Sequence, residues 1–314
     1  MTRYIIRRLI HSIFIIWGVA TLVFFGLRAI PGDPVVQILG EEYTPEAAER
    51  VEHKLGLDQP VYVQYARWMG NVLTGDLGQS IASNETVTDA IKTGLPKTAS
   101  ITILSFTFAL VIAIPAGIIA ALRRNTWLDY TSSLIAFFGV AMPGFWFGII
   151  LILIFAVRLN WLPAIGYSSL DKGVWAWFSH LILPSVAVGT GLAAILMRFV
   201  RTGLLEVMGS DYVRTARAKG VAERNVVIRH ALRNSLIPIV TIAGIQLALL
   251  INGTVVIEIV FSIRGMGRIL VGAIFDKDYP IAQGIILFTS VVFVMANLVV
   301  DIVYTFLDPR IRYD

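Results

Sequence analysis

Cysteine is absent from this sequence, and charged residues make up only 15% of its 314 positions. Without cysteine the chain has neither disulfides nor thiolate metal ligands. Soluble domains carry about 25% charged residues, so the low charge excludes an ordinary soluble domain. Histidine is also scarce and lacks the spacing of metal ligands, at His11, His53, His180 and His230. We therefore expect no metal site, no catalytic residue and no cofactor bound by this chain.

Apolar residues are abundant instead: they make up 56% of the chain and give a mean hydropathy of +0.75. A bilayer core needs about 20 apolar residues in a helix, whose backbone polar groups are all paired internally. Six runs without Asp, Glu, Lys or Arg reach that length: Leu9–Leu27, Thr98–Leu122, Ser132–Val157, Ser179–Met197, Leu236–Ile257 and Ile281–Val300. The sequence therefore predicts an all-α integral membrane protein with six transmembrane helices.

The first apolar run follows Arg3, Arg7 and Arg8, as the core of a secretory signal would. It is longer than a signal core of about 7–15 residues, and no small-residue cleavage site follows it. A rigid helix stop, Pro31–Pro34, comes next. We interpret the run as a retained membrane span.

The distribution of Lys and Arg predicts the orientation of the spans. Arginines precede the first run and directly follow the second, at Arg123 and Arg124. The connection 198–235 holds eight bases against three acids, whereas segment 31–97 holds ten acids against five bases. Both chain ends are therefore predicted to be cytoplasmic, and segment 31–97 to lie outside. Anionic lipid headgroups account for the basic pI of about 9.5 without a nucleic acid.

Three parts follow from this pattern. They are a cytoplasmic N-terminus with the first helix (1–30), a periplasmic segment (31–97) and a five-helix core (98–314) that contains the cytoplasmic loop 198–235. In the outer segment, Thr44 before Pro45 predicts a helix start, and Gly56 predicts its end. A second short helix is predicted over 61–73. Two such helices make a poor core, so we expect them to lie on the membrane domain.

Polar side chains are few inside the predicted spans. Gln246, Asn252 and Asn297 lie in the last two spans, where each must face protein or water. They either form hydrogen bonds between helices or line a translocation path, and we name them as candidate path residues. Glu258 lies near a span end, where we expect it at the membrane interface. Pro143 removes a hydrogen bond inside an apolar run, and we attribute it to helix packing.

The connection 198–235 predicts two helices joined by a turn. Asp211 is a good helix cap, residues 212–219 favour a helix, and Gly220 supplies a left-handed stop. A second helix then continues into the fifth span at Pro238. By composition alone this connection could be a lipid-binding surface, a docking site for a protein or a DNA-binding element.

Tyr212–Gly220 and His230–Asn234, with Pro238, resemble the EAA loop of ABC importer permeases, in the version of the dipeptide, oligopeptide and nickel branch. Ala216 and Leu232 match the general pattern. The departures are usual for the peptide branch: Arg214, Thr215, His230 and Arg233. Further segments are similar to landmarks of that branch: Arg7–Leu9, Pro31–Pro34, Leu55–Pro60, Gly75–Gly78, Glu258–Ser262, Gly265–Gly267, Asp278–Pro280 and Asp308–Arg310.

The resemblance implies a type I ABC importer permease-like fold with a cytoplasmic EAA-type coupling helix, in the inner membrane of a bacterium. It also implies the partners: a second homologous permease, two cytoplasmic ABC ATPase subunits that bind ATP and Mg²⁺, and a periplasmic or lipid-anchored solute-binding protein. Membrane lipid surrounds the chain, and no nucleic acid is expected. The residues implied to contact the ATPase are Arg214, Thr215, Ala216, Arg217, Ala218, Lys219 and Gly220.

The function that the resemblance implies is ATP-driven import of short peptides by alternating access. Glutathione and nickel chelates are the alternative substrates of permeases with this pattern. A secondary transporter or a channel is the competing class, and ion coupling would require ionisable residues inside the spans. The six apolar runs contain no Asp, Glu, Lys or Arg.

Overall fold

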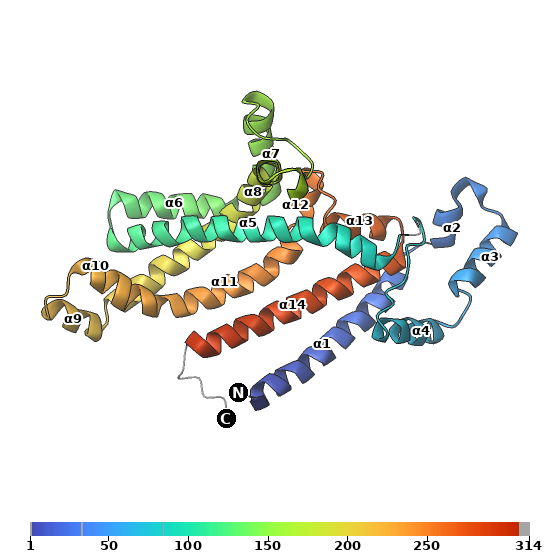
Figure 1. Ribbon diagram of the computed structural model, residues 1–314, viewed down its shortest axis with the longest axis horizontal. Helices are drawn as coiled ribbons and strands as arrows, with labels where there is room; N and C mark the ends of the chain where they lie inside the picture. Colours follow the sequence, from blue (N-terminus) through green and yellow to red (C-terminus); the bar gives the residue numbers. More distant parts are fainter. Residues whose placement is uncertain (1, 33, 84, 308–314) are drawn as a thin grey trace. The chain divides into compact units, whose positions relative to one another are not determined.

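The computed structural model describes residues 2–32, 34–83 and 85–307 (Figure 1). Within these ranges the chain is helical, and its only paired extended residues are Gln79 and Thr86. The α-helices are α1 (Thr2–Ala29), α2 (Pro34–Leu39), α3 (Pro45–Leu55), α4 (Val61–Leu73), α5 (Val87–Leu122), α6 (Trp127–Ala141), α7 (Gly144–Leu151), α8 (Val174–Met208), α9 (Asp211–Ala218), α10 (Glu223–Asn225), α11 (Arg233–Gly253), α12 (Val255–Val260), α13 (Met266–Phe275) and α14 (Tyr279–Leu307). Short 3₁₀ segments are η1 (Gly40–Glu42) and η3 (Leu170–Lys172), and π-helical segments are η2 (Ile152–Arg158) and η4 (Val226–Leu232). The all-α prediction is confirmed.

The chain divides into two compact units. Unit 1 comprises Met1–Lys97 and Arg264–Val294, and unit 2 comprises Thr98–Ile263 and Met295–Asp314. Helices α5 and α14 each begin in unit 1 and end in unit 2.

Among the described residues, four helices are long and apolar enough to cross a bilayer: Ile6–Ala29, Val87–Leu122, Val174–Met208 and Tyr279–Val300. They contain the first, second, fourth and sixth predicted spans. α8 runs beyond the predicted end at Met197 and carries Arg198 and Arg201 in its final turns. The helix therefore extends past its apolar run.

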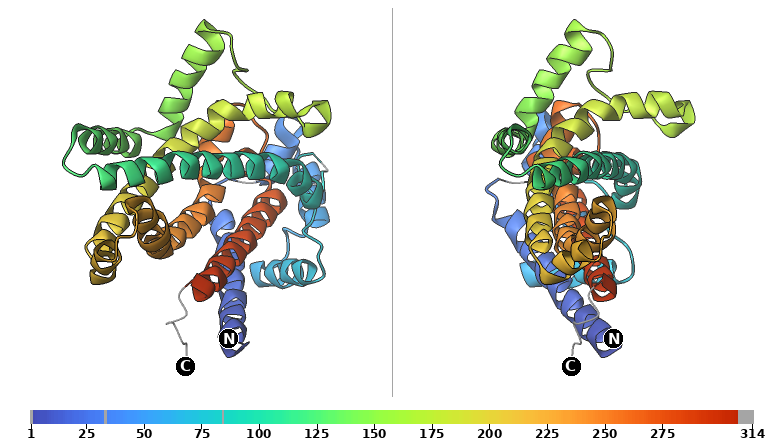
Figure 2. Two further views of the ribbon diagram at one scale, coloured as in Figure 1. Left: turned by 60° about the vertical axis from the view of Figure 1, so that its left-hand side comes forward. Right: turned by 90° about the vertical axis from the view of Figure 1, so that its left-hand side faces the viewer.

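The third predicted span is broken. α6 and the helical segment Gly144–Arg158 form a pair bent by 102° (Figure 2). Pro143 lies at the break, because proline has no N–H and disfavours a helical residue before it. The expected interruption of the helix at Pro143 is confirmed, and its attribution to helix packing stays a prediction. Met142 accordingly has φ −84° and ψ 123°.

The fifth predicted span forms α11 and α12, which meet at Thr254. Its described apolar part, Ile239–Leu250, is shorter than a span requires. A membrane-type helical fold is confirmed, with four apolar helices in the described part of the chain, or five if the bent pair is one span. The count of six stays a prediction.

In unit 1 the start of α5 packs against α13 and α14. Val87, Ala90 and Ile285 belong to one buried apolar cluster. α14 approaches α5 closely at Gly284, where an added Cβ would lie 2.2 Å from Cγ1 of Val87. Glycine at this position is therefore a requirement of helix packing.

The two short outer helices form where the sequence predicts them. Thr44 caps α3 by accepting the backbone N–H of Ala47 at 3.2 Å, and Gly56 ends that helix with φ +67°. α4 runs from Val61 to Leu73 as predicted. Its Tyr65 and Trp68 rings lie 5.2 and 5.4 Å from the ring of Phe24 on α1. α4 thus lies on a membrane-type helix, as expected.

Unit 2 is built around α8, which packs against α5, α6, α7 and α11. At Gly117 of α5 an added Cβ would lie 2.6 Å from Cβ of Val200, so the two helices are in close contact. Arg201 donates to both carboxylate oxygens of Asp129 at 2.6 and 2.8 Å, and the Asp129 side chain is only 3% exposed. Removing either partner would leave the other charge unpaired, so this ion pair fixes the start of α6 against α8.

Candidate functional site

The connection between α8 and α11 is the candidate site, and its local structure follows the sequence. α9 covers Asp211–Ala218, with Ser210 rather than Asp211 as the N-cap residue. Gly220 has φ +77°, as predicted for a left-handed helix stop. Its N–H binds the carbonyl oxygen of Arg217 at 2.9 Å, and the N–H of Val221 binds that of Ala216 at 3.3 Å. The chain then enters α10, η4 and α11.

α9 has an inner face and an outer face. Val213 and Ala216 are buried with Val226 of η4 in one apolar cluster, to which Val207 and Met208 at the end of α8 contribute. Ala216 is only 8% exposed. The other predicted contact residues lie on the exposed side: Arg214, Thr215, Arg217, Ala218, Lys219 and Gly220. Ala216 therefore holds α9 onto its own connection and does not form part of its outer surface.

Hydrogen bonds of Tyr212 and Arg217 join α9 to α10, to η4 and to the start of α11. The hydroxyl of Tyr212 accepts a hydrogen bond from Nδ2 of Asn234 on α11 at 2.8 Å and donates one to the carbonyl oxygen of His230 at 3.4 Å. Arg217 donates to both carboxylate oxygens of Glu223 on α10, at 2.7 and 3.1 Å. This hydrogen bond lowers the pKa of the Glu223 carboxyl and raises the pKa of Arg217. The connection is thus braced across its turn and to α11.

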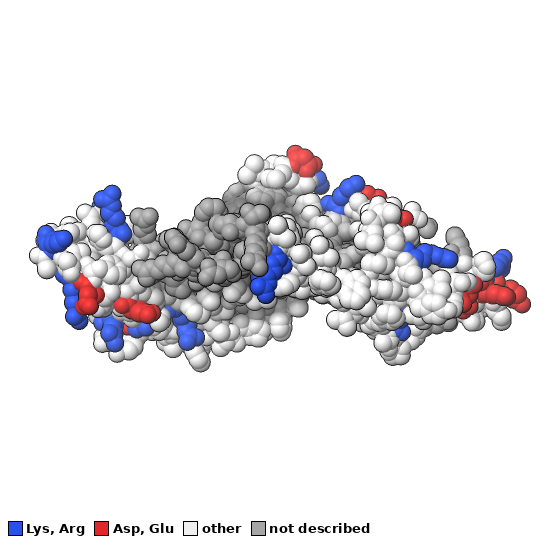
Figure 3. Space-filling view, turned by 90° about the horizontal axis from the view of Figure 1, so that it is seen from below, with Lys and Arg blue, Asp and Glu red and all other residues white. Residues whose placement is uncertain are grey.

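The outer surface of this connection is basic. Lys and Arg gather over α9 and α10 (Figure 3), where Arg214, Lys219 and Arg224 are exposed. Arg214 also lies 3.6 Å from Asp211 in an exposed pair, which contributes little to stability. The surface can therefore receive an acidic or hydrogen-bond-accepting partner.

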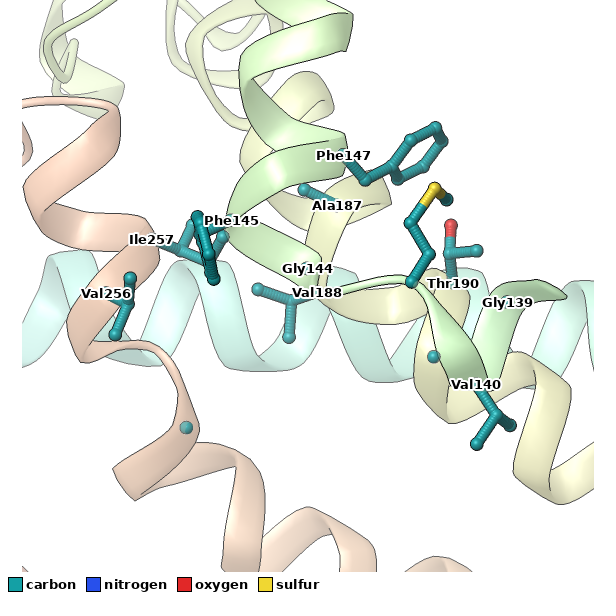
Figure 4. A pocket seen from close by; sticks show the side chains of 13 residues that line it. Gly139, Val140, Gly144, Phe145, Phe147, Ala187, Val188, Thr190, Val256 and Ile257 are labelled. Atoms are coloured by element: carbon teal, nitrogen blue, oxygen red, sulfur yellow. The ribbon is translucent and has the colours of Figure 1, made fainter.

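Of the candidate path residues, Gln246 on α11 and Asn297 on α14 are half-buried. The side chain of Asn252 lies outside the described residues. A pocket of about 310 Å³ in unit 2 is lined instead by apolar side chains and glycines at the α6–α7 break, on α8 and around α12 (Figure 4). Among the described residues that line it, only Thr190 has a polar side chain, and its hydroxyl donates to the carbonyl oxygen of Val186 on the same helix at 2.7 Å. Gln246 and Asn297 do not belong to this lining.

The environment of Glu258 could not be predicted from the sequence. Its side chain is fully buried in unit 2, and its expected position at the membrane interface stays a prediction. Its Oε1 accepts the hydroxyls of Thr98 at 2.6 Å and Thr254 at 3.1 Å. The spacing of Thr254 and Glu258, four residues apart, was the available signal, but the contact with Thr98 arises only in the fold.

The arrangement of these helices is similar to solved structures of an ABC transporter. The chain aligns with inward-facing structures of the MetNI methionine ABC transporter with TM-scores of 0.59 and 0.58, at 20% and 19% identity, covering 70% of this chain and 96% and 97% of the solved chains. The fold is therefore that of a type I ABC importer permease.

Sequence comparison places the chain within that class. Residues 113–313 match the model of the binding-protein-dependent transport system inner membrane component, and residues 1–102 match the N-terminal part of such membrane components. The chain belongs to the family of binding-protein-dependent transport system inner membrane components, as its EAA-like loop implied.

Among the relatives that match over the full length of both chains are two from different bacteria. A protein of Brucella abortus (strain 2308), which has the provisional name peptide transport system permease protein, is 41% identical over 314 residues. The glutathione transport system permease protein GsiC of Escherichia coli (strain K12) is 42% identical over 313 residues.

Proposed function

We propose that this chain is the transmembrane subunit of an ATP-driven importer that moves short peptides across the bacterial inner membrane by alternating access. It would pair with a second homologous permease, two cytoplasmic ATPase subunits that hold ATP and Mg²⁺, and a periplasmic or lipid-anchored solute-binding protein. Both chain ends and loop 198–235 would face the cytoplasm, segment 31–97 the periplasm, and 98–314 would form the permease core. The family and the peptide permease of Brucella abortus support this function.

The observation that carries the proposal is the bracing of α9. Its inner face packs on residues at the end of α8 through the Val213 and Ala216 cluster, and Tyr212 binds Asn234 on α11. A displacement of α9 is therefore transmitted to α8 and α11 through these contacts. Such a segment can convert closure of an ATPase into helix movement, provided that its contacts differ between the two states.

The proposed contact surface is the exposed side of the turn. Arg214, Thr215, Ala218, Lys219 and Gly220 would touch the ATPase directly. Arg217 would do so only in part, since Glu223 holds its guanidinium. Ala216 would act from within, by keeping α9 on its connection.

A matched pair of substitutions tests the docking surface. Ala218→Trp places a bulky side chain on the exposed face of α9, and Ala66→Trp makes the same change at an exposed position of α4. We expect Ala218→Trp to lose co-purification of the ATPase and the ATP hydrolysis that loaded binding protein stimulates. Ala66→Trp should keep the co-purified ATPase. Normal ATPase binding and stimulation in Ala218→Trp would rule out this face as the docking surface.

Glutathione is the second candidate substrate, because GsiC of Escherichia coli is as similar to the chain as the peptide permease is. Uptake of labelled dipeptide and of labelled glutathione into proteoliposomes, each with the cognate external binding protein, separates the two. Gln246, Asn252 and Asn297 stay candidate path residues, and the half-buried positions of Gln246 and Asn297 are compatible with that role.

A further inference from the structure

Unit 1 contains a pocket of about 410 Å³, and its lining includes none of the residues proposed to contact an ATPase. Its walls come from the end of α1, from α3 and α4, from residues 76–81 and from the first turns of α14. Parts of three landmark segments meet there: Leu55–Pro60, Gly75–Gly78 and Asp278–Pro280. The fold thus gathers separate sequence motifs around one cavity.

Arg28 provides a positive charge in this pocket, and its hydrogen bonds within the described part of the chain go to uncharged acceptors. Its Nε and Nη2 donate to Oε1 of Gln64 at 3.3 and 3.0 Å, and Nη1 donates to the carbonyl oxygen of Phe24 at 3.2 Å. Its guanidinium carbon lies 3.6 Å from the ring centre of Phe24 and 5.5 Å from that of Tyr279. A guanidinium has five N–H donors, so this half-buried cation keeps donors for an anionic ligand.

Gln283 provides a second, independent sign of a missing ligand. Its side chain is only 3% exposed, and its Nε2 has no hydrogen-bond partner among the described residues. Buried amide donors are nearly always paired, so an acceptor oxygen is expected beside Gln283 when the pocket is filled.

The remaining lining narrows the chemistry of the ligand. Arg67 brings a second guanidinium, and Trp68 an aromatic face. Asp76 brings a carboxylate, whose Oδ1 accepts the N–H of Gly78 at 2.9 Å. The pocket therefore offers two cations, an orphan amide donor, an aromatic surface and one carboxylate.

We propose that this pocket binds a short peptide by its free carboxyl end. The peptide carboxylate would pair with Arg28 and Arg67, and a peptide carbonyl oxygen would accept Nε2 of Gln283. The ammonium group at the other end of the peptide would pair with the carboxylate of Asp76. The negative charge of Asp76 would repel a lipid phosphate. The choice of a peptide as ligand rests on the proposed function. Binding in unit 1 requires neither ATP nor an ATPase, so its failure can be distinguished from a failure of the coupling function.

Direct binding to the full chain tests the site. The chain, with the subunits that co-purify with it, is placed in nanodiscs without ATP or external binding protein, and calorimetry measures binding of dialanine and of dialanine amide. We expect saturable binding of dialanine and roughly tenfold weaker binding of the amide, as the loss of one charge-assisted hydrogen bond would give. Absence of dialanine binding, or equal binding of the amide, overturns the proposal.

The variant Gln283→Leu separates binding from structure. It removes a donor that has no partner in the described structure, so dialanine affinity should fall roughly tenfold while the thermal unfolding temperature stays the same or rises. Gln59→Leu, an exposed position outside the pocket lining, is the matched control and should bind normally. A fall in unfolding temperature in Gln283→Leu would identify a structural amide. Native mass spectrometry tests for a bound phospholipid. A phospholipid present on the wild type, absent from Arg28→Gln and not displaced by dialanine would identify a headgroup site. A structural amide at Gln283 or a headgroup site would each overturn the proposal.

Discussion

α9 and α3 are both short, exposed helices that end at a left-handed glycine, yet the structure holds them in different ways. α3 is fixed locally: Thr44 caps its start, Gly56 ends it, and Arg50 donates to the carbonyl oxygen of Glu46 in the same helix. α9 instead reaches outward, through its apolar cluster to α8 and through Tyr212 to α11. Contacts between neighbouring residues are enough to form a short helix. Movement of that helix can be transmitted only through contacts with long helices.

The largest expected effect is that of Gly220→Val. An added Cβ at Gly220 meets nothing within 4 Å, so the cost arises from its φ of +77° alone. A β-branched residue there is strained by about 1–2 kcal/mol, which shifts the end of α9. We expect loss of the ATP hydrolysis that loaded binding protein stimulates, measured in proteoliposomes, with membrane insertion unchanged.

Gly220→Asn is the control for that strain, because asparagine tolerates the left-handed conformation. It should retain most of the stimulation. Equal loss in both variants would indicate that the space at Gly220 matters rather than its backbone conformation, and full stimulation in Gly220→Val would contradict the coupling function of the turn.

A smaller effect is expected from Tyr212→Phe, which removes the hydroxyl between α9 and α11 and keeps the ring. The lost hydrogen bonds with Asn234 and His230 contribute about 0.5–1.5 kcal/mol each. Stimulated ATP hydrolysis should fall several-fold while the ATPase still co-purifies, since the docking surface is intact. Loss of co-purification would show that Tyr212 contacts the ATPase instead of transmitting its movement.

The features that the sequence predicted well depend on neighbours along the chain. The Thr44 cap, the bounds of α4 and the left-handed Gly220 each follow from a few adjacent residues, and each is confirmed. The inward position of Ala216 was not predicted. A small residue fits a docking surface and a buried cluster equally well, and only the packing of Val226 from η4 against α9 distinguishes them.

The features that the sequence missed depend on residues that are far apart. The sequence did not predict that Thr98, 160 positions away, donates to the carboxylate of Glu258. Arg201 forms an ion pair with the buried Asp129 across 72 positions. The break at Pro143 was locally visible, but proline is common in membrane helices, and its consequence depends on what can satisfy the freed backbone groups.

The smallest expected effect concerns the pair Arg217 and Glu223, which closes the turn after α9. The hydrogen bond from Arg217 lowers the pKa of Glu223 below its ordinary value of about 4.3, which the unfolded chain retains. The stabilising contribution of the pair is therefore complete above that pH and is lost as the pH falls through the lower, folded value. The side chains are 40% and 59% exposed, so solvent screening limits the contribution to about 0.5 kcal/mol.

Hydrogen exchange of the amides of residues 219–226, corrected for intrinsic rates, measures this contribution. The wild type should lose protection as the pH is lowered from about 6 to about 3, across the ordinary carboxyl range, whereas Glu223→Gln should lack this component because its side chain does not titrate. Glu206→Gln removes an exposed carboxylate of α8 that makes no hydrogen bond in the described structure, and it should behave like the wild type. Since α3 has no comparable ion pair among its described residues, its amides should show no such loss over the same range. The same pH-dependent loss in Glu223→Gln would mean that other carboxylates hold the turn, and the bracing of α9 would then rest on its apolar cluster and Tyr212 alone.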